Sequence, residues 1–406
     1  MRGSTRDTTA LAVGSATSGI LAYVVFALTT RTLGADSAAP VSVLWSYWSF
    51  AGAAFAFPLQ HWIARSVTTH GEGAVRLALP RLSLAILATS LALGLLAWLG
   101  RAQLFQRDDL WFPSLVVLVT LGSALIGVAR GGLSASRRFV SVGWSLAAEN
   151  AVRCVAVGAL ILTDVRSPVA YGLCLVAGHL VAFLWPTSLG FDRHATAVES
   201  PSPFAFLTGA ALAQLLGQVV LTGGPVVLAL AGGTPADVTA LFAALALFRA
   251  PYILALGLVS QLTGMVTRLV VEGKQRALRR IRNLILGATS VSVILGGAVG
   301  ALWGPALLRL IFGEEVIVES GQAAVVAVAC TIAVANLVVT VTVLAQNRPS
   351  AVVRSWTIAV VGAGLGFVAL AARPAPEQTV WCFLIAESVA FMALLLAQER
   401  EARSTA

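Results

Sequence analysis

Long apolar runs recur along the whole sequence, and they constrain its fold more than any other feature. A helix of about 20 residues with few charges crosses a hydrocarbon core about 30 Å thick. The sequence holds about twelve such runs, approximately at 9–31, 40–63, 82–100, 111–130, 140–163, 168–189, 204–231, 238–262, 283–306, 320–345, 351–372 and 377–398. We therefore predict an all-α polytopic membrane protein with about twelve transmembrane helices.

Composition supports this prediction and excludes a water-soluble globule. Hydrophobic residues make up 58% of the chain and charged residues 11%, which leaves too little polar surface to cover a soluble domain of this size. The first residues are basic and precede an apolar stretch, as in a signal peptide, but that stretch is too long. We interpret it as the first membrane span.

The arginines predict how the chain is oriented. If the N-terminus is cytoplasmic, the connections on that side hold 19 of the 27 Lys and Arg residues, including Arg130, whereas the other side holds six. Cytoplasmic loops carry an excess of Lys and Arg, so both termini are predicted to face the cytoplasm of a bacterial cell membrane. Membrane topology and acidic inner-leaflet lipids then explain the net charge of +9, and we expect no nucleic-acid partner.

The two halves of the sequence repeat each other at a spacing of about 200 residues. At an offset of 201, Ala35-Asp36 falls on Ala236-Asp237, and at 208, CLVAGHLVAF (174–183) falls on CFLIAESVAF (382–391). Such internal repeats are common in transporters. We predict two six-helix lobes related by a pseudo-two-fold axis along the membrane normal. Their bounds are 1–189 and 204–406, with a cytoplasmic linker at 190–203.

The ends of several predicted helices carry a family resemblance. They read ALTTRTLGAD (27–36), LQHWIARSV (59–67), GVARGGLSASRRF (127–139), LLRLIFGEEV (307–316) and VLAQNRPSAVV (343–353). This layout resembles the oligosaccharide (Wzx-like) flippases of the MATE/MOP superfamily, which also includes the lipid II flippases and the MATE drug exporters. The lipid II flippases carry extra helices and a string of arginines along their first two helices. Here, no basic residue lies between Arg6 and Arg31.

The resemblance implies a function and the place of its site. It implies export of a polyprenyl-diphosphate-linked oligosaccharide from the inner to the outer leaflet by alternating access. It also implies that helices 1, 2, 7 and 8 line a central cleft and that a cavity arginine lies on helix 8. The implied partners are the lipid-linked substrate, membrane lipids and a coupling ion, H⁺ or Na⁺. We expect no other cofactor.

The candidate substrate-binding residues lie in the two spans that start the second half. Arg249 has no acidic neighbour within one helical turn, and Pro251 removes a backbone donor two residues later. A guanidinium binds phosphate bidentately, so Arg249, with Tyr252 nearby, suits a diphosphate. The alternative is a structural contact between helices. Gln214, Gln218 and Thr222 form one polar stripe before a Gly-Gly-Pro break, which indicates either a cavity lining or hydrogen bonds between helices.

Two further groups of polar residues lie inside predicted spans. Glu149 and Arg153 are four residues apart on one helix face, with Asn150 beside them, and form either an ion pair turned into the lobe or a gating pair. His179 and Glu387 occupy equivalent positions of the two halves and can change charge, so they are candidates for proton coupling or simply packing groups. We expect no metal site.

Other classes of function fit less well. An enzyme of the polyprenyl-sugar pathway needs a large extramembrane loop or a carboxylate cluster, and no connection exceeds about 20 residues, so we predict no enzyme. A MATE-type cation-coupled multidrug exporter shares the predicted fold and is the main alternative. It calls for acidic cavity residues, whereas Arg249 favours an anion. A scaffold without transport activity is the third option.

Overall fold

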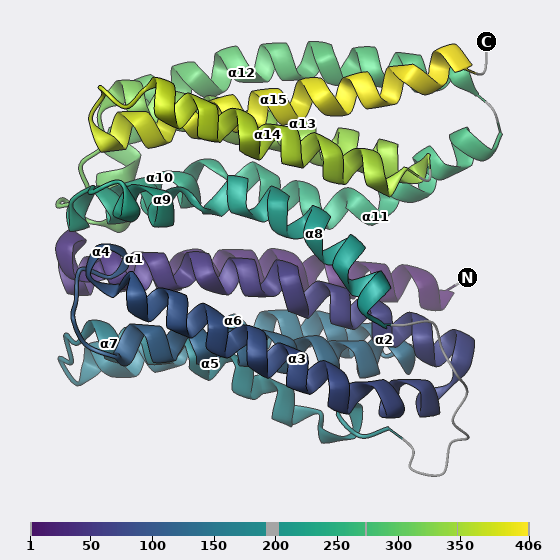
Figure 1. Ribbon diagram of the computed structural model, residues 1–406, viewed down its shortest axis with the longest axis horizontal. Helices are drawn as coiled ribbons and strands as arrows, with labels where there is room; N and C mark the ends of the chain where they lie inside the picture. The colour runs from purple at the N-terminus through teal and green to yellow at the C-terminus, as the bar shows by residue number, and fades with distance from the viewer. Residues whose placement is uncertain (1, 192–202, 273, 347, 405–406) are drawn as a thin grey trace. The chain divides into compact units, whose positions relative to one another are not determined.

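The computed structural model describes residues 2–191, 203–272, 274–346 and 348–404, and within these ranges every regular element is a helix (Figure 1). The first half contains α1 (Arg2–Ala51), a π-helix (Gly52–Ala56), α2 (Phe57–His70), α3 (Glu72–Leu99), α4 (Arg101–Leu104), α5 (Trp111–Ala135), α6 (Phe139–Leu162), α7 (Pro168–Ala177) and two 3₁₀ turns (Gly178–Leu184, Pro186–Ser188). The second half contains α8 (Pro203–Thr222), α9 (Gly224–Leu230), α10 (Pro235–Phe248), α11 (Ala250–Val271), α12 (Gln275–Phe312), α13 (Ser320–Ala345), α14 (Pro349–Ala369) and α15 (Ala375–Ser404). The predicted all-α class is confirmed.

The chain divides into two compact units, Met1–Leu215 and Leu216–Ala406. The division falls inside α8. Most of the predicted linker at 190–203, namely residues 192–202, lies outside the described residues.

Eight helices are long and apolar enough to cross a membrane within the described ranges, or up to ten if each of two bent pairs counts as one span. This number is lower than the predicted twelve for two physical reasons. Residues 9–70 run on as one helical stretch through the first two predicted spans, although Gly34 breaks the helical backbone between them. The sixth span, Pro168–Leu184, is short because its second half is wound as 3₁₀-helix.

Two glycine turns fall at equivalent places of the predicted repeat. Gly34 and Gly232 both have positive φ, at 77° and 83°, where the first membrane helix of each half gives way to the second. Only a residue without a Cβ adopts this conformation readily. After the second turn, a capping box between Thr234 and Asp237 starts α10 and satisfies its first backbone N–H groups.

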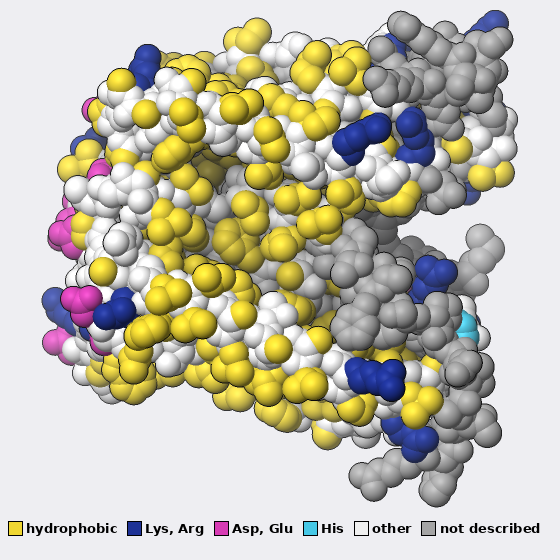
Figure 2. All heavy atoms as spheres, in the orientation of Figure 1, with side chains coloured by type: hydrophobic (Ala, Val, Ile, Leu, Met, Phe, Trp, Pro, Cys, Tyr) yellow, Lys and Arg dark blue, Asp and Glu magenta, His cyan; other side chains and the backbone are white. Residues whose placement is uncertain are grey.

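Charged side chains gather at the ends of the helices. On the face shown in Figure 2, Asp and Glu lie at the left-hand ends together with some Lys and Arg, and further Lys and Arg lie toward the right-hand ends, with hydrophobic and uncharged side chains between them. Three arginines predicted to face outward each pair with a neighbouring carboxylate: Arg107 with Asp109 at 2.6 Å, Arg166 with Asp164 at 3.0 Å, and Arg373 with Glu377 at 3.0 Å. Half of the six basic residues predicted to face outward are thus neutralised locally.

Candidate functional site

A buried carboxylate organises the interior of the first unit. Glu149 on α6 accepts from Arg153 Nη2 through Oε1 and from Arg130 Nη2 on α5 through Oε2, each at 2.6 Å. All three side chains are almost completely buried. The sequence predicted the Glu149–Arg153 pair, but it placed Arg130 in a cytoplasmic connection. That placement is wrong, because α5 continues to Ala135 and carries Arg130 inside the unit.

Arg153 uses its whole guanidinium within the same network. Its Nη1 donates to Asn150 Oδ1 at 2.8 Å, its Nε donates to the Leu175 carbonyl at 3.0 Å, and its Cζ lies 4.5 Å from the centre of the Trp48 ring. Asn150 in turn donates to Ser18 Oγ on α1 at 2.9 Å. An arginine bonded in this way is tolerated in an apolar interior, because every donor nitrogen has an acceptor and the charge has a carboxylate.

The network joins elements from the start to the end of the unit. It connects Ser18 and Trp48 on α1, Arg130 on α5, the polar residues of α6 and the carbonyl of Leu175 on α7. Two arginines face one glutamate, so the cluster already carries one excess positive charge. We call Arg130, Glu149, Asn150 and Arg153 the clamp. We interpret it as structural, because neither residue of the Glu149–Arg153 pair is open to a substrate.

His179 lies at the edge of this clamp. Its Nδ1 is 3.1 Å from the Val176 carbonyl, its Nε2 is 3.4 Å from Ser123 Oγ, and Nε2 is 3.9 Å from Glu149 Oε1. A carbonyl can only accept, so His179 Nδ1 donates its proton to Val176. The nearest carboxylate is already shared by two arginines, which leaves His179 as a packing and hydrogen-bonding group.

Gly178 allows the clamp to close, which leads to a testable prediction. A Cβ at Gly178 would collide with Arg153 Nε and lie 2.8 Å from the Glu149 carbonyl, whereas a Cβ at Gly158, on the same α6 as the clamp, would meet nothing within 4 Å. We expect Gly178→Ala to lower the melting temperature of the purified protein clearly. Gly158→Ala should leave it unchanged or raise it, because alanine favours a helix by about 0.5–1 kcal/mol. Equal melting temperatures for the two variants would refute the close approach.

The second unit carries a different buried polar group at the equivalent place. Glu387 on α15 is fully buried, and its Oε2 accepts from Asn336 Nδ2 on α13 at 2.7 Å, much as Ser123 meets His179 in the first unit. Glu387 Oε1 and Asn336 Oδ1 have no hydrogen-bond partner in the described part of the chain. In the first unit, arginines donate to both oxygens of Glu149. In the second unit, one oxygen of Glu387 and the Asn336 oxygen have no donor among the described residues.

Arg249 lies at a break in the helix near the middle of predicted span 238–262. It ends α10 and precedes α11, with φ −84° and ψ 1°, and the two helical segments meet at a 47° bend. Its guanidinium stands over the Phe242 ring at 5.7 Å, and its buried Nε has no hydrogen-bond partner among the described residues. α13, which carries Asn336, packs against both α11 and α15. The second unit therefore holds a cation at a helix break and a buried carboxylate.

The polar stripe of α8 ends at the break that the sequence predicted. Gln218 Nε2 donates to Thr222 Oγ1 at 3.3 Å, Thr222 in turn donates to the Gln218 carbonyl at 2.9 Å, and Gln214 is exposed. After Thr222 the chain bends by 65° into α9. The break is confirmed, and two of the three polar side chains satisfy each other within the helix. Tyr252 is half-buried on the first turn of α11.

Sequence reasoning missed several members of these clusters. Arg130 and Asn336 are single polar residues in apolar surroundings, and their distance in sequence from Glu149 and Glu387 gives no hint of contact. Trp48 resembles any other apolar residue. The one available signal was the match of His179 to Glu387, since the partners Ser123 and Asn336 lie on the corresponding helices of the two halves.

Comparisons with known proteins identify the fold. No family model and no curated relative matches this sequence. Among solved structures, an inward-facing multidrug resistance MATE family transporter of the MOP superfamily matches with a TM-score of 0.68 at 15% identity, covering 96% of this chain and 95% of that chain. The lipid II flippase MurJ, in an inward closed conformation, matches with a TM-score of 0.66 at 13% identity, covering 94% and 86%.

A third similar structure differs in the character of its pocket. This MOP superfamily transporter from Pyrococcus furiosus matches with a TM-score of 0.60 at 13% identity, covering 97% of this chain and 95% of that chain, and the reverse polarity of its binding pocket suggests a different function. Identities this low are informative about architecture alone. The chain therefore has the fold of the MATE/MOP transporters.

Proposed function

We propose that this protein is a transporter of the bacterial cytoplasmic membrane that moves a polyprenyl-diphosphate-linked oligosaccharide from the inner to the outer leaflet by alternating access. One observation carries the proposal: Arg249 is a cation at a helix break in mid-span, with a buried Nε that lacks a partner within the described residues. An unpaired charge at this depth is costly and usually serves a substrate or ion pathway. The similar structures include a lipid II flippase, whose substrate is also lipid-linked.

A diphosphate headgroup suits Arg249 better than an organic cation does. A guanidinium stays charged in low dielectric and binds phosphate oxygens through two parallel N–H groups. Tyr252, three residues further along, and Gln218 of α8 are the polar side chains of the same unit that would supply hydrogen bonds to sugar or phosphate oxygens. We assign no catalytic residue, because translocation between leaflets breaks no covalent bond.

Glu387 is the proposed coupling group. It is fully buried, its Oε1 has no hydrogen-bond partner in the described ranges, and it lies in the same unit as Arg249. A carboxylate with an unused oxygen can take up a proton there, whereas His179 in the first unit is hydrogen-bonded beside two arginines. We therefore assign coupling to Glu387 in preference to His179.

Glu387→Gln tests this assignment. Glutamine keeps a carbonyl oxygen for Asn336 but cannot ionise, so we expect substrate exchange to continue while its dependence on an imposed pH gradient disappears. Transport by proteoliposomes with and without a pH gradient measures this difference. His179→Gln is the matched control and should keep the dependence. A Glu387→Gln protein that responds to the gradient like wild type would exclude Glu387 from coupling.

A MATE-type cation-coupled multidrug exporter is the second candidate. Two observations favour it: the buried carboxylate of Glu387 and the multidrug transporters among the similar structures. It requires negative charge on the substrate path, and the charge of the binding pocket differs between proteins of this fold. Arg249 favours an anion, and we therefore propose the flippase over the exporter.

Deletion of the gene in its native host separates the two candidates. The flippase proposal predicts that lipid-linked oligosaccharide accumulates in the deletion strain and that sensitivity to cationic drugs is unchanged. Extraction of polyprenyl-linked sugars and measurement of inhibitory drug concentrations test both points. Normal lipid-linked sugar together with raised drug sensitivity would establish the exporter instead.

A further inference from the structure

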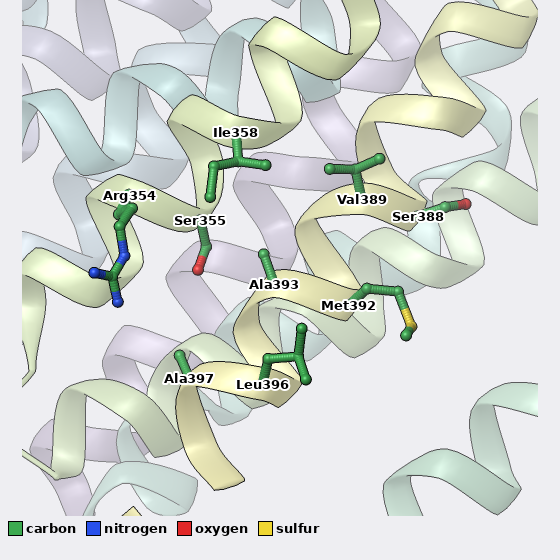
Figure 3. Close-up of a pocket in the computed structure, with 9 residues that line it drawn as sticks. All are labelled: Arg354, Ser355, Ile358, Ser388, Val389, Met392, Ala393, Leu396 and Ala397. Carbon is green, nitrogen blue, oxygen red and sulfur yellow. The ribbon is translucent and has the colours of Figure 1, made fainter. Parts of the chain in front are cut away.

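A groove on the second unit remains outside the proposed transport site. It lies between α14 and α15, has a volume of about 590 Å³, and is lined mainly by Ile358, Val389, Met392, Ala393 and Leu396. In Figure 3, Ile358 and Val389 lie toward one end of the groove and Leu396 toward the other. Its lining spans residues 388–397 of α15, roughly 14 Å of helix.

One end of this apolar groove carries a cation without a protein counter-ion. Arg354 is exposed and lines the groove, and it makes no hydrogen bond or ion pair in the described part of the chain. Figure 3 shows its guanidinium extending from α14 along the side of the groove where Ala397 lies. The nearby Arg348, by contrast, is fixed, because its Nη1 donates to the Ala397 carbonyl at 2.6 Å.

The place of this arginine in the membrane selects the kind of ligand. The orientation predicted from the arginine distribution puts the start of α14 at the cytoplasmic side, where the leaflet is rich in acidic lipid. Three of the arginines predicted to face outward, Arg107, Arg166 and Arg373, pair with carboxylates, whereas Arg354 has no acidic partner among the described residues and can take an external anion. An apolar channel of this length with a guanidinium at one end matches an acyl chain joined to a phosphate.

We propose that the α14–α15 groove binds one acidic phospholipid of the inner leaflet, with an acyl chain along Ile358, Val389 and Ala393 and its phosphate on Arg354. Burial of the acyl chain in the apolar groove gives no preference over the surrounding lipid, because lipid is equally apolar. The charge-assisted bond to Arg354 supplies the preference for an anionic headgroup. This site is independent of substrate transport, since Arg249 and Glu387 do not line it.

Native mass spectrometry of the full-length protein in detergent tests the site. Dioleoylphosphatidylglycerol and dioleoylphosphatidylcholine are titrated separately, and bound lipid is counted. We expect phosphatidylglycerol to bind about tenfold more tightly, and Arg354→Ala to remove that difference without changing phosphatidylcholine binding. Arg309→Ala, at another exposed arginine of the same unit, should behave like wild type.

Further variants locate the acyl chain and separate this site from transport. Ala393→Phe fills the groove and should weaken binding of both lipids, and Arg249→Ala should bind both as wild type does. If Ala393→Phe lowers the melting temperature, the comparison of wild type with Arg354→Ala tests the proposal instead. Arg354 is exposed, so its replacement should not disturb folding. Equal affinity of wild type for the two lipids, unchanged binding by Arg354→Ala, or displacement of phosphatidylglycerol by inorganic phosphate at millimolar concentration would overturn the proposal.

Discussion

Replacing Arg249 by alanine is expected to lower the rate of transport about 100-fold while the protein still folds and inserts in the membrane. Hydrogen bonds to a charged group contribute about 1.5–3 kcal/mol each, and every 1.36 kcal/mol is a tenfold change in rate. Loss of one bidentate contact to a diphosphate therefore accounts for about two orders of magnitude. Stability should change little, because the Arg249 side chain makes no ion pair in the described structure and only one ring contact, with Phe242.

The measurement is the production of exported polysaccharide in a deletion strain that carries each variant at equal protein level. Arg249→Lys keeps the charge but loses the bidentate geometry, so it should fall between alanine and wild type. Arg309→Ala removes an exposed arginine of the same unit and should be fully active. Full polysaccharide production by Arg249→Ala would remove Arg249 from the mechanism.

Replacing Glu149 by glutamine is expected to destabilise the first unit by about 3–5 kcal/mol. The change leaves Arg130 and Arg153 buried without their shared carboxylate, and breaking a buried ion pair from one side carries a cost of this size. Arg130→Gln should cost much less, because it leaves Glu149 and Arg153 as a neutral pair. The free energy of unfolding, measured by denaturant titration in micelles, gives this comparison.

An exposed ion pair of the same unit provides the control. Asp164 and Arg166 are both strongly exposed, at 80% and 69% of their side-chain surface, and such pairs contribute about 0–1 kcal/mol. Asp164→Asn should therefore leave the free energy of unfolding within about 1 kcal/mol of wild type. If Glu149→Gln behaves like Asp164→Asn, or if Arg130→Gln is the more damaging change, the clamp does not depend on charge balance as argued.

The architecture could be predicted from the sequence because the bilayer imposes it. In lipid, backbone groups must be satisfied within the segment, so an apolar run of membrane length becomes a helix. Sequence reasoning also located the break after Thr222, where Gly-Gly-Pro weakens the helix, whereas it noted the donor lost at Pro251 without predicting the bend at Arg249. It failed at the ends of elements: α5 extends past Arg130, and Gly34 breaks a helical run without ending it.

The polar clusters were only partly predictable, for a different reason. Glu149 and Arg153 are four residues apart, so helical geometry alone pairs them. Arg130 and Trp48 join the same cluster through tertiary packing, which no local pattern encodes. In the second unit the repeat matched His179 to Glu387, but only the structure shows that Asn336 bonds one oxygen of Glu387 and that the other lacks a partner within the described ranges.

Translocation by the purified protein is the most direct test of the proposed function. A fluorescent polyprenyl-diphosphate-linked oligosaccharide is placed in the inner leaflet of proteoliposomes, and its arrival in the outer leaflet is followed by quenching from outside. We predict that wild-type protein moves the lipid-linked sugar and that Arg249→Ala moves it about 100-fold more slowly. Vesicles in which wild-type protein transports an organic cation while the lipid-linked sugar stays in its original leaflet would contradict the proposal.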